Sequence, residues 1–96
     1  MLELRPTCEH CGRALPPEST EARICTFECT FCRACVEGVL ANVCPNCGGG
    51  FERRPIRPKT ALVKHPPRMD EVRKPVDEAA FAPLRAARRG VPPTER

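Results

Sequence analysis

The sequence predicts a small α+β fold that depends on bound metal ions, followed by a largely disordered tail. Eight cysteines lie within the first 47 of the 96 residues, and most of them form Cys-x2-Cys pairs. Two thiolates at this spacing can bind one tetrahedral zinc ion at about 2.3 Å without straining the backbone. Large apolar residues are few in the same segment, and the chain has no Trp and no Tyr. We therefore expect two structural zinc ions, each bound by four cysteines, to stabilise the fold.

Disulfides and iron–sulfur clusters are the other uses of so many cysteines. The first six residues lack the basic start and the apolar run of a signal peptide. We therefore expect a cytoplasmic location, where thiols stay reduced, and this favours zinc over disulfides. No stretch is long and apolar enough to predict a membrane span.

Three short elements are expected in the cysteine-rich part. Val36, Val39 and Leu40 share one face of a predicted helix from Arg33 to Ala41, and Asn42 is a plausible stop. The segment around Cys25 and Cys29 predicts a small hairpin. Residues 51–58 predict a terminal strand or extended segment that lies back on the module. Gly12 and Gly48 each follow a Cys-x2-Cys pair, where the chain turns with a positive φ that glycine tolerates.

The charge distribution divides the chain into two regions. Residues 1–58 carry seven basic and seven acidic side chains, whereas residues 59–96 carry nine basic and five acidic ones. The formal net charge of +4 therefore belongs to the tail. Eight thiolates with two Zn²⁺ would give the module a formal charge of about −4. Six prolines among the 38 tail residues predict disorder. One island, residues 78–89, could form a short helix capped by Asp77, with Pro83 expected to kink or break it. This helix is expected to be transient, and folding on a partner or packing onto the core are the alternatives.

The full cysteine pattern resembles that of RING fingers. It reads Cys8-x2-Cys11-x13-Cys25-x3-Cys29-x2-Cys32-x2-Cys35-x8-Cys44-x2-Cys47, with Cys29 where RING domains usually place a histidine. The resemblance implies a treble-clef module with cross-brace ligation, in which successive ligand pairs alternate between the ions. The first zinc is then bound by Cys8, Cys11, Cys32 and Cys35, and the second by Cys25, Cys29, Cys44 and Cys47. The spacing alone leaves open a sequential arrangement, in which the first four and the last four cysteines bind separate ions.

Residues 2–58 also resemble a family of small bacterial proteins known only as a domain of unknown function. The shared motifs are Leu2–Pro6, Cys25–Cys32, Cys44–Gly49 and Arg53–Pro58. This resemblance implies a bacterial zinc-binding protein and supplies no activity.

The predicted sites carry no sign of catalysis. Eight thiols fill two tetrahedra, so neither ion is expected to keep the open position that a catalytic zinc needs. His10 and His65 are expected to lie outside the metal sites. The sequence therefore favours a non-catalytic, protein-binding platform, with nucleic-acid binding through the basic tail as the alternative. A ubiquitin-ligase-like adaptor is a remote alternative, because Glu9, Gly48 and the absence of Trp depart from that pattern. The sequence predicts neither the partner nor the oligomeric state.

Overall fold

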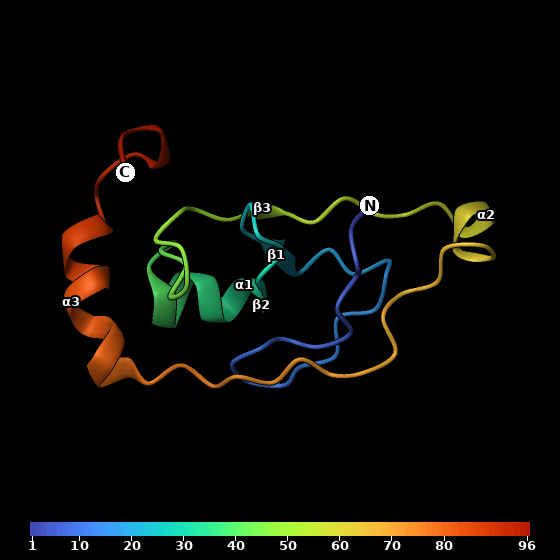
Figure 1. Ribbon diagram of the computed structural model, residues 1–96, viewed down its shortest axis with the longest axis horizontal. Helices are drawn as coiled ribbons and strands as arrows, with labels where there is room; N and C mark the ends of the chain where they lie inside the picture. Colours follow the sequence, from blue (N-terminus) through green and yellow to red (C-terminus); the bar gives the residue numbers. More distant parts are fainter.

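A three-stranded antiparallel sheet of very short strands organises the first half of the chain. The computed structural model describes all 96 residues, and the strand order is β2-β1-β3 (Figure 1). The elements are β1 (Ala22–Ile24), β2 (Thr30–Cys32), α1 (Arg33–Cys35), η1 (Val36–Leu40), β3 (Glu52–Arg53), α2 (Lys59–Leu62), α3 (Glu78–Arg88) and η2 (Pro93–Glu95). No helix combines the length and the apolar character that crossing a membrane would require.

The predicted hairpin and terminal strand are both present. β1 pairs with β2 so that Ala22 lies opposite Cys32 and Ile24 lies opposite Thr30. On its other edge β1 pairs with β3, which comes from the segment expected to lie back on the module. The hairpin therefore ends at Cys32, and its loop carries Cys25 and Cys29.

The predicted helix from Arg33 to Ala41 is confirmed as a continuous pair of elements. α1 leads directly into η1, and the helical backbone ends where Ala41 adopts a left-handed φ of 50°. Val36 and Leu40 are buried, and Val39 packs against the core from its edge. This is the apolar face that the spacing of the three residues predicts.

The hydrophobic core is small and is built largely from cysteine. Its buried cluster has 14 members, and six of them are cysteines. The rings of Phe31 and Phe51 meet edge to face with centroids 5.5 Å apart. Phe27 and Ile56 stay 70% and 46% exposed, so two of the few large apolar side chains add little to this core. Residues of the two cysteine clusters therefore make up a large part of the core.

The expectation of a largely disordered tail is wrong. The tail runs back alongside the N-terminal segment to α3, whose Arg85 Nη1 donates to Val39 O of η1 at 3.0 Å, and it ends in η2 (Figure 1). Its backbone donates hydrogen bonds from Arg68 N to Glu3 O at 2.9 Å and from Lys74 N to Glu9 O at 2.8 Å. Phe81 belongs to the core and is only 6% exposed. The prediction of disorder rests on the residues of the tail alone, whereas the tail is ordered by its contacts with the module.

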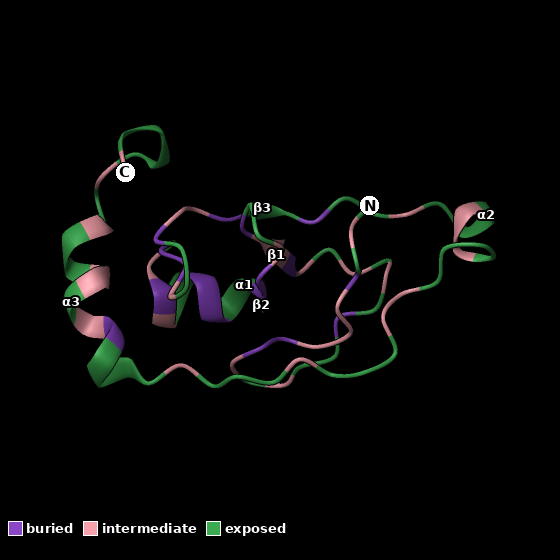
Figure 2. Ribbon diagram, viewed as in Figure 1, coloured by how far each residue is buried: buried purple, intermediate pink, exposed green.

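Helix α3 confirms the short helix predicted for residues 78–89, and Pro83 does not break it. The side chain of Asp77 accepts a hydrogen bond from Ala80 N at 3.2 Å, as an N-cap does. Pro83 lies inside the helix on its exposed side, where water can satisfy the carbonyl that lacks its N–H partner. Phe81 is the only buried residue of α3 (Figure 2). One apolar anchor therefore holds a helix that is otherwise exposed or half-buried.

Candidate metal centre

The first cysteine cluster joins two segments that are far apart in the sequence. The sulfurs of Cys8, Cys11, Cys32 and Cys35 all lie within 4.8 Å of one another. Cys8 and Cys11 belong to the loop of residues 8–12, which we call the first knuckle, and Cys32 and Cys35 flank the start of α1. Cys8, Cys32 and Cys35 are buried, while Cys11 is exposed.

The spacing of these sulfurs fits a tetrahedral metal ion. Four sulfurs that each lie about 2.3 Å from zinc at the corners of a tetrahedron are about 3.8 Å apart. The sulfurs of Cys11 and Cys32 are separated by 3.7 Å. None of the eight cysteines forms a disulfide. The cluster can therefore hold one metal ion with all four ligands supplied by the chain.

The second cluster brings together Cys25, Cys44 and Cys47, again within 4.8 Å of one another. Cys25 comes from the hairpin loop, and the other two come from residues 44–48, which we call the second knuckle. Cys29, predicted as the fourth ligand, lies outside this set, and its sulfur accepts a hydrogen bond from Asn46 Nδ2 at 3.3 Å. Its role as a ligand therefore stays a prediction.

The two knuckles have the same backbone design. Gly12 N donates to Cys8 O at 3.0 Å, and Gly48 N donates to Cys44 O at 2.8 Å. The φ angles of the two glycines are 78° and 75°, in the left-handed region where a side chain is strained. The positive φ expected at both glycines is confirmed. Each turn holds its two sulfurs on one side of the loop, toward the clusters.

The environment of the sulfurs disfavours free thiolates at most of the positions where a pKa shift is resolved. Burial raises the pKa of Cys25 to about 11, and it also raises the pKa of Cys35 and Cys44 well above the usual range. At exposed Cys11 partial burial is outweighed by hydrogen bonding to Arg13 and the neighbouring cysteines, which lowers its pKa. Thiolates buried this way are disfavoured unless a metal ion compensates their charge. The donor set therefore fits a divalent metal.

The two histidines lie outside both clusters. Nδ1 of His10 accepts a hydrogen bond from Val76 N at 2.9 Å, so this ring fastens the tail to the first knuckle. His65 is exposed, and its carbonyl accepts a hydrogen bond from Arg57 Nη1 at 2.7 Å.

Glu9 is a buried carboxylate that sequence reasoning did not place. It is 3% exposed, and Oε2 accepts hydrogen bonds from Thr30 N and from Arg5 Nη1, the latter at 2.9 Å. Glu9 therefore fastens the first knuckle to β2. The pattern gave no signal for this role, because a carboxylate between two cysteines is normally exposed to water.

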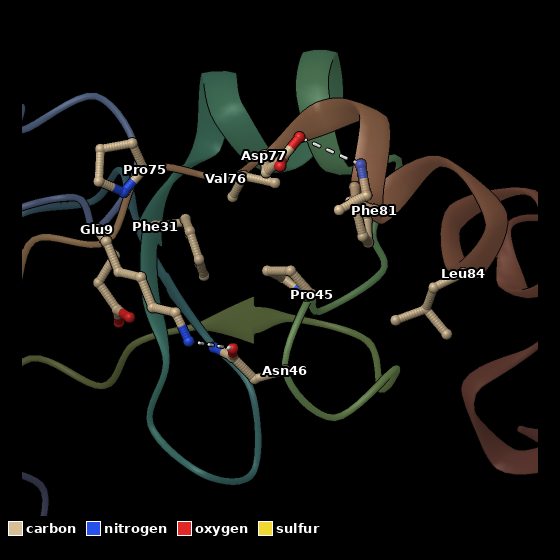
Figure 3. Close-up of a pocket in the computed structure, with 11 residues that line it drawn as sticks. Glu9, Phe31, Pro45, Asn46, Pro75, Val76, Asp77, Phe81 and Leu84 are labelled. Carbon is tan, nitrogen blue, oxygen red and sulfur yellow. Dashed lines mark hydrogen bonds between the residues drawn. The ribbon is translucent and has the colours of Figure 1, made fainter.

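A cavity of about 290 Å³ separates the module from the tail (Figure 3). The Lys74 ammonium reaches Asn46 Oδ1 at 3.5 Å across it. Its apolar walls come from Phe31 of β2, Pro45 of the second knuckle and Phe81 of α3. The cavity shows that the tail covers the module surface between the two knuckles without filling it completely.

Comparisons with known proteins agree with this picture of a small cysteine-rich module. Residues 1–57 match the family model described as "Protein of unknown function (DUF1272)". An uncharacterised protein of Rhizobium meliloti (strain 1021) is 55% identical over 87 residues, which cover 91% of this chain and 100% of the relative. Because 87 aligned residues exceed the 57 of the family match, this similarity extends into the tail. No solved structure matches the chain significantly. The chain therefore belongs to the DUF1272 family of proteins of unknown function.

Proposed function

We propose that this chain is a non-catalytic zinc protein whose two structural ions hold a RING-like, cross-braced platform for binding another protein. The observation that carries the proposal is the alternation of the clusters. The first cluster joins the first and third cysteine pairs along the chain, and the second joins Cys25 with the last pair. Such interleaving ties each ion to both halves of the module.

Zinc is the metal that the donor set favours. Thiolate ligands in a tetrahedral arrangement select zinc over the harder cations, which prefer oxygen. We propose Cys29 as the fourth ligand of the second ion, since it is buried, lies in the same loop as Cys25, and its carbonyl accepts a hydrogen bond from Cys25 N at 3.2 Å. Both sites are then closed, and neither keeps an open position for catalysis.

Protein binding is favoured over nucleic-acid binding by how the tail uses its charges. Arg68 pairs with Glu3 and Asp70 at 3.1 Å and 2.9 Å. Arg85 Nη1 donates to Val39 O at 3.0 Å. Phosphate contacts would have to compete with these internal bonds. Phe81, the only tail aromatic, is buried and cannot stack on a base.

The hairpin loop offers a contact point for a protein partner. Phe27 lies between Cys25 and Cys29 and is 70% exposed, in a loop that a bound metal would make rigid. Rigid exposed aromatic side chains are frequent anchors in protein interfaces. The ubiquitin-ligase-like alternative is less favoured, because Glu9 is committed to internal hydrogen bonds rather than to a binding groove. We also propose a bacterial, cytoplasmic setting, in keeping with the rhizobial relative and the free thiols.

Native mass spectrometry of protein made in a reducing cytosol tests the metal part of the proposal. The expected mass includes two zinc ions, which are lost together with the fold when a strong chelator is added. A mass that is short by paired hydrogens and indifferent to chelator would mean disulfides and would overturn the proposal.

Site-specific photo-crosslinking in cells tests the partner. A crosslinker at position 27 should give one discrete protein adduct, whereas a crosslinker at Val63, which is 83% exposed, serves as the matched control. Equal adducts from both positions would contradict the proposed contact point. Tight binding to DNA or RNA that weakens steeply between about 50 and 200 mM salt, and disappears when residues 59–96 are deleted, would favour the nucleic-acid alternative.

A further inference from the structure

The tail lies over both knuckles at equivalent places. The guanidinium of Arg73 lies against Gly12, with Nη1 nearest to the position that a Cβ would occupy there and Cζ 2.8 Å from it. At the second knuckle, Nε of Arg88 lies 3.8 Å from the equivalent position at Gly48. One arginine of the tail therefore lies near each knuckle, at the glycine that directly follows the Cys-x2-Cys pair.

These arginines have weak acidic partners or none. Arg73 approaches Glu71 at 3.6 Å, and both side chains are nearly half exposed. Arg88 makes no ion pair with any carboxylate. Each of them lies over a glycine that directly follows a cysteine of a cluster, and four thiolates around Zn²⁺ would give that site a formal charge of about −2.

Hydrogen bonds to uncharged acceptors hold the tail along the two knuckles. Lys74 N and Val76 N donate to Glu9 O and to His10 Nδ1, so residues 74–76 run along the first knuckle. Beyond α3, Arg96 Nη1 donates to Asn42 O at 2.8 Å and to Gly48 O at 3.3 Å. The tail is thereby held along both metal clusters.

We propose that the two metal-bearing knuckles form an arginine-docking surface whose occupant is the chain's own tail, so that metal loading and tail docking stabilise each other. The inference rests on the proposed zinc sites. The charges of the two regions match: the module becomes formally about −4 when both sites are loaded, and residues 59–96 carry four more basic than acidic side chains. By thermodynamic linkage, the free energy by which bound metal stabilises tail docking equals the free energy by which the docked tail stabilises metal binding.

Replacing one thiolate by a neutral ligand tests the charge without removing the metal. Cys11→His lowers the first site's formal negative charge by about one unit while keeping four zinc ligands. In the full-length, zinc-loaded chain, hydrogen exchange at the amides of Lys74 and Val76 should become roughly threefold faster, as expected for a weakened, partly exposed charge pair. Cys47→His is the matched control, since it should speed exchange in α3 and leave these two amides unchanged.

Arg73→Gln supplies the reciprocal test with all eight thiols in place. Zinc transfer to a competing chelator should become roughly threefold easier. Arg89→Gln, at an exposed position without an ion pair, should leave transfer unchanged. Two zinc ions by native mass spectrometry with unchanged exchange and unchanged transfer would overturn this inference and leave the proposed function standing. A wild-type chain that holds no zinc would overturn both.

Discussion

Arg54 provides the sharpest test of how the module is held together. Its side chain is 2% exposed, yet it has no acidic partner, and burial lowers its pKa. The guanidinium donates to Arg5 O at 2.9 Å, to Leu15 O at 3.0 Å and to Pro16 O at 2.9 Å. These carbonyls belong to the N-terminal segment around the first knuckle. One buried cation directly after β3 therefore fixes that segment against the sheet.

We expect Arg54→Met to destabilise the zinc-loaded chain by about 2–4 kcal/mol, because the aliphatic packing remains while three carbonyl acceptors lose a charged donor. At about 4–8 °C per kcal/mol for a domain of this size, the melting temperature should fall by roughly 8–32 °C in constant excess zinc. Arg54→Lys keeps the charge but lacks the several N–H donors of a guanidinium, so it should lower the melting temperature less than Arg54→Met does.

Arg53→Met is the matched control, because Arg53 is the last residue of β3, directly precedes Arg54, and is exposed. Its melting temperature should change by no more than a few degrees, in line with about 0.5 kcal/mol for a surface change. If Arg54→Met melts like the wild type, or if the two Met variants lose the same stability, the assignment of Arg54 as a structural clamp is refuted.

Three further predictions follow from the knuckles, the tail and the thiols. Gly12→Ala should lower the free energy of unfolding by about 1–2 kcal/mol, because it places a Cβ at positive φ, where the Arg73 guanidinium must also move aside. Gly38→Ala, in a helical turn with nothing within 4 Å, should be neutral or stabilising in the same melting assay. Equal losses in the two variants would contradict this. Phe81→Ala should abolish the hydrogen-exchange protection of α3 and leave β1 and β2 protected, since Phe81 is the only buried residue of that helix; protection that persists would show that other contacts hold it. Because burial raises the pKa of Cys25 to about 11 and that of Cys44 still further, protons compete with the metal at neutral pH. Zinc affinity measured by chelator competition should therefore rise from about pH 6 to about pH 8 and fall on acidification, and a flat profile would argue against thiolate ligation.

The parts of the fold that sequence reasoning anticipates are those that local patterns determine. Three such patterns each span only a few residues: the cysteine spacing, the glycines that close the knuckles, and the apolar face of Val36, Val39 and Leu40. The hairpin and the helix after it therefore match expectation.

The features that sequence reasoning misses depend on partners far along the chain. The tail is ordered by hydrogen-bond acceptors on the module, such as Glu9 O, and by the packing of Phe81 into the core. Neither contact can be predicted from the composition of the tail. Arg54 is buried because three carbonyls from distant residues meet there, although arginine is normally exposed. Phe27 shows the reverse, an aromatic residue left outside a core that has few of them.

Alternate cysteine pairs share each metal ion in the proposed cross-brace, and two double variants test this sharing by native mass spectrometry. In a cross-brace, Cys8→Ser with Cys32→Ser damages only the first site, whereas Cys8→Ser with Cys25→Ser damages both. We predict that the first variant retains one zinc ion and that the second retains none. The reverse result, one ion in the second variant and none in the first, would mean sequential ligation and would contradict the account.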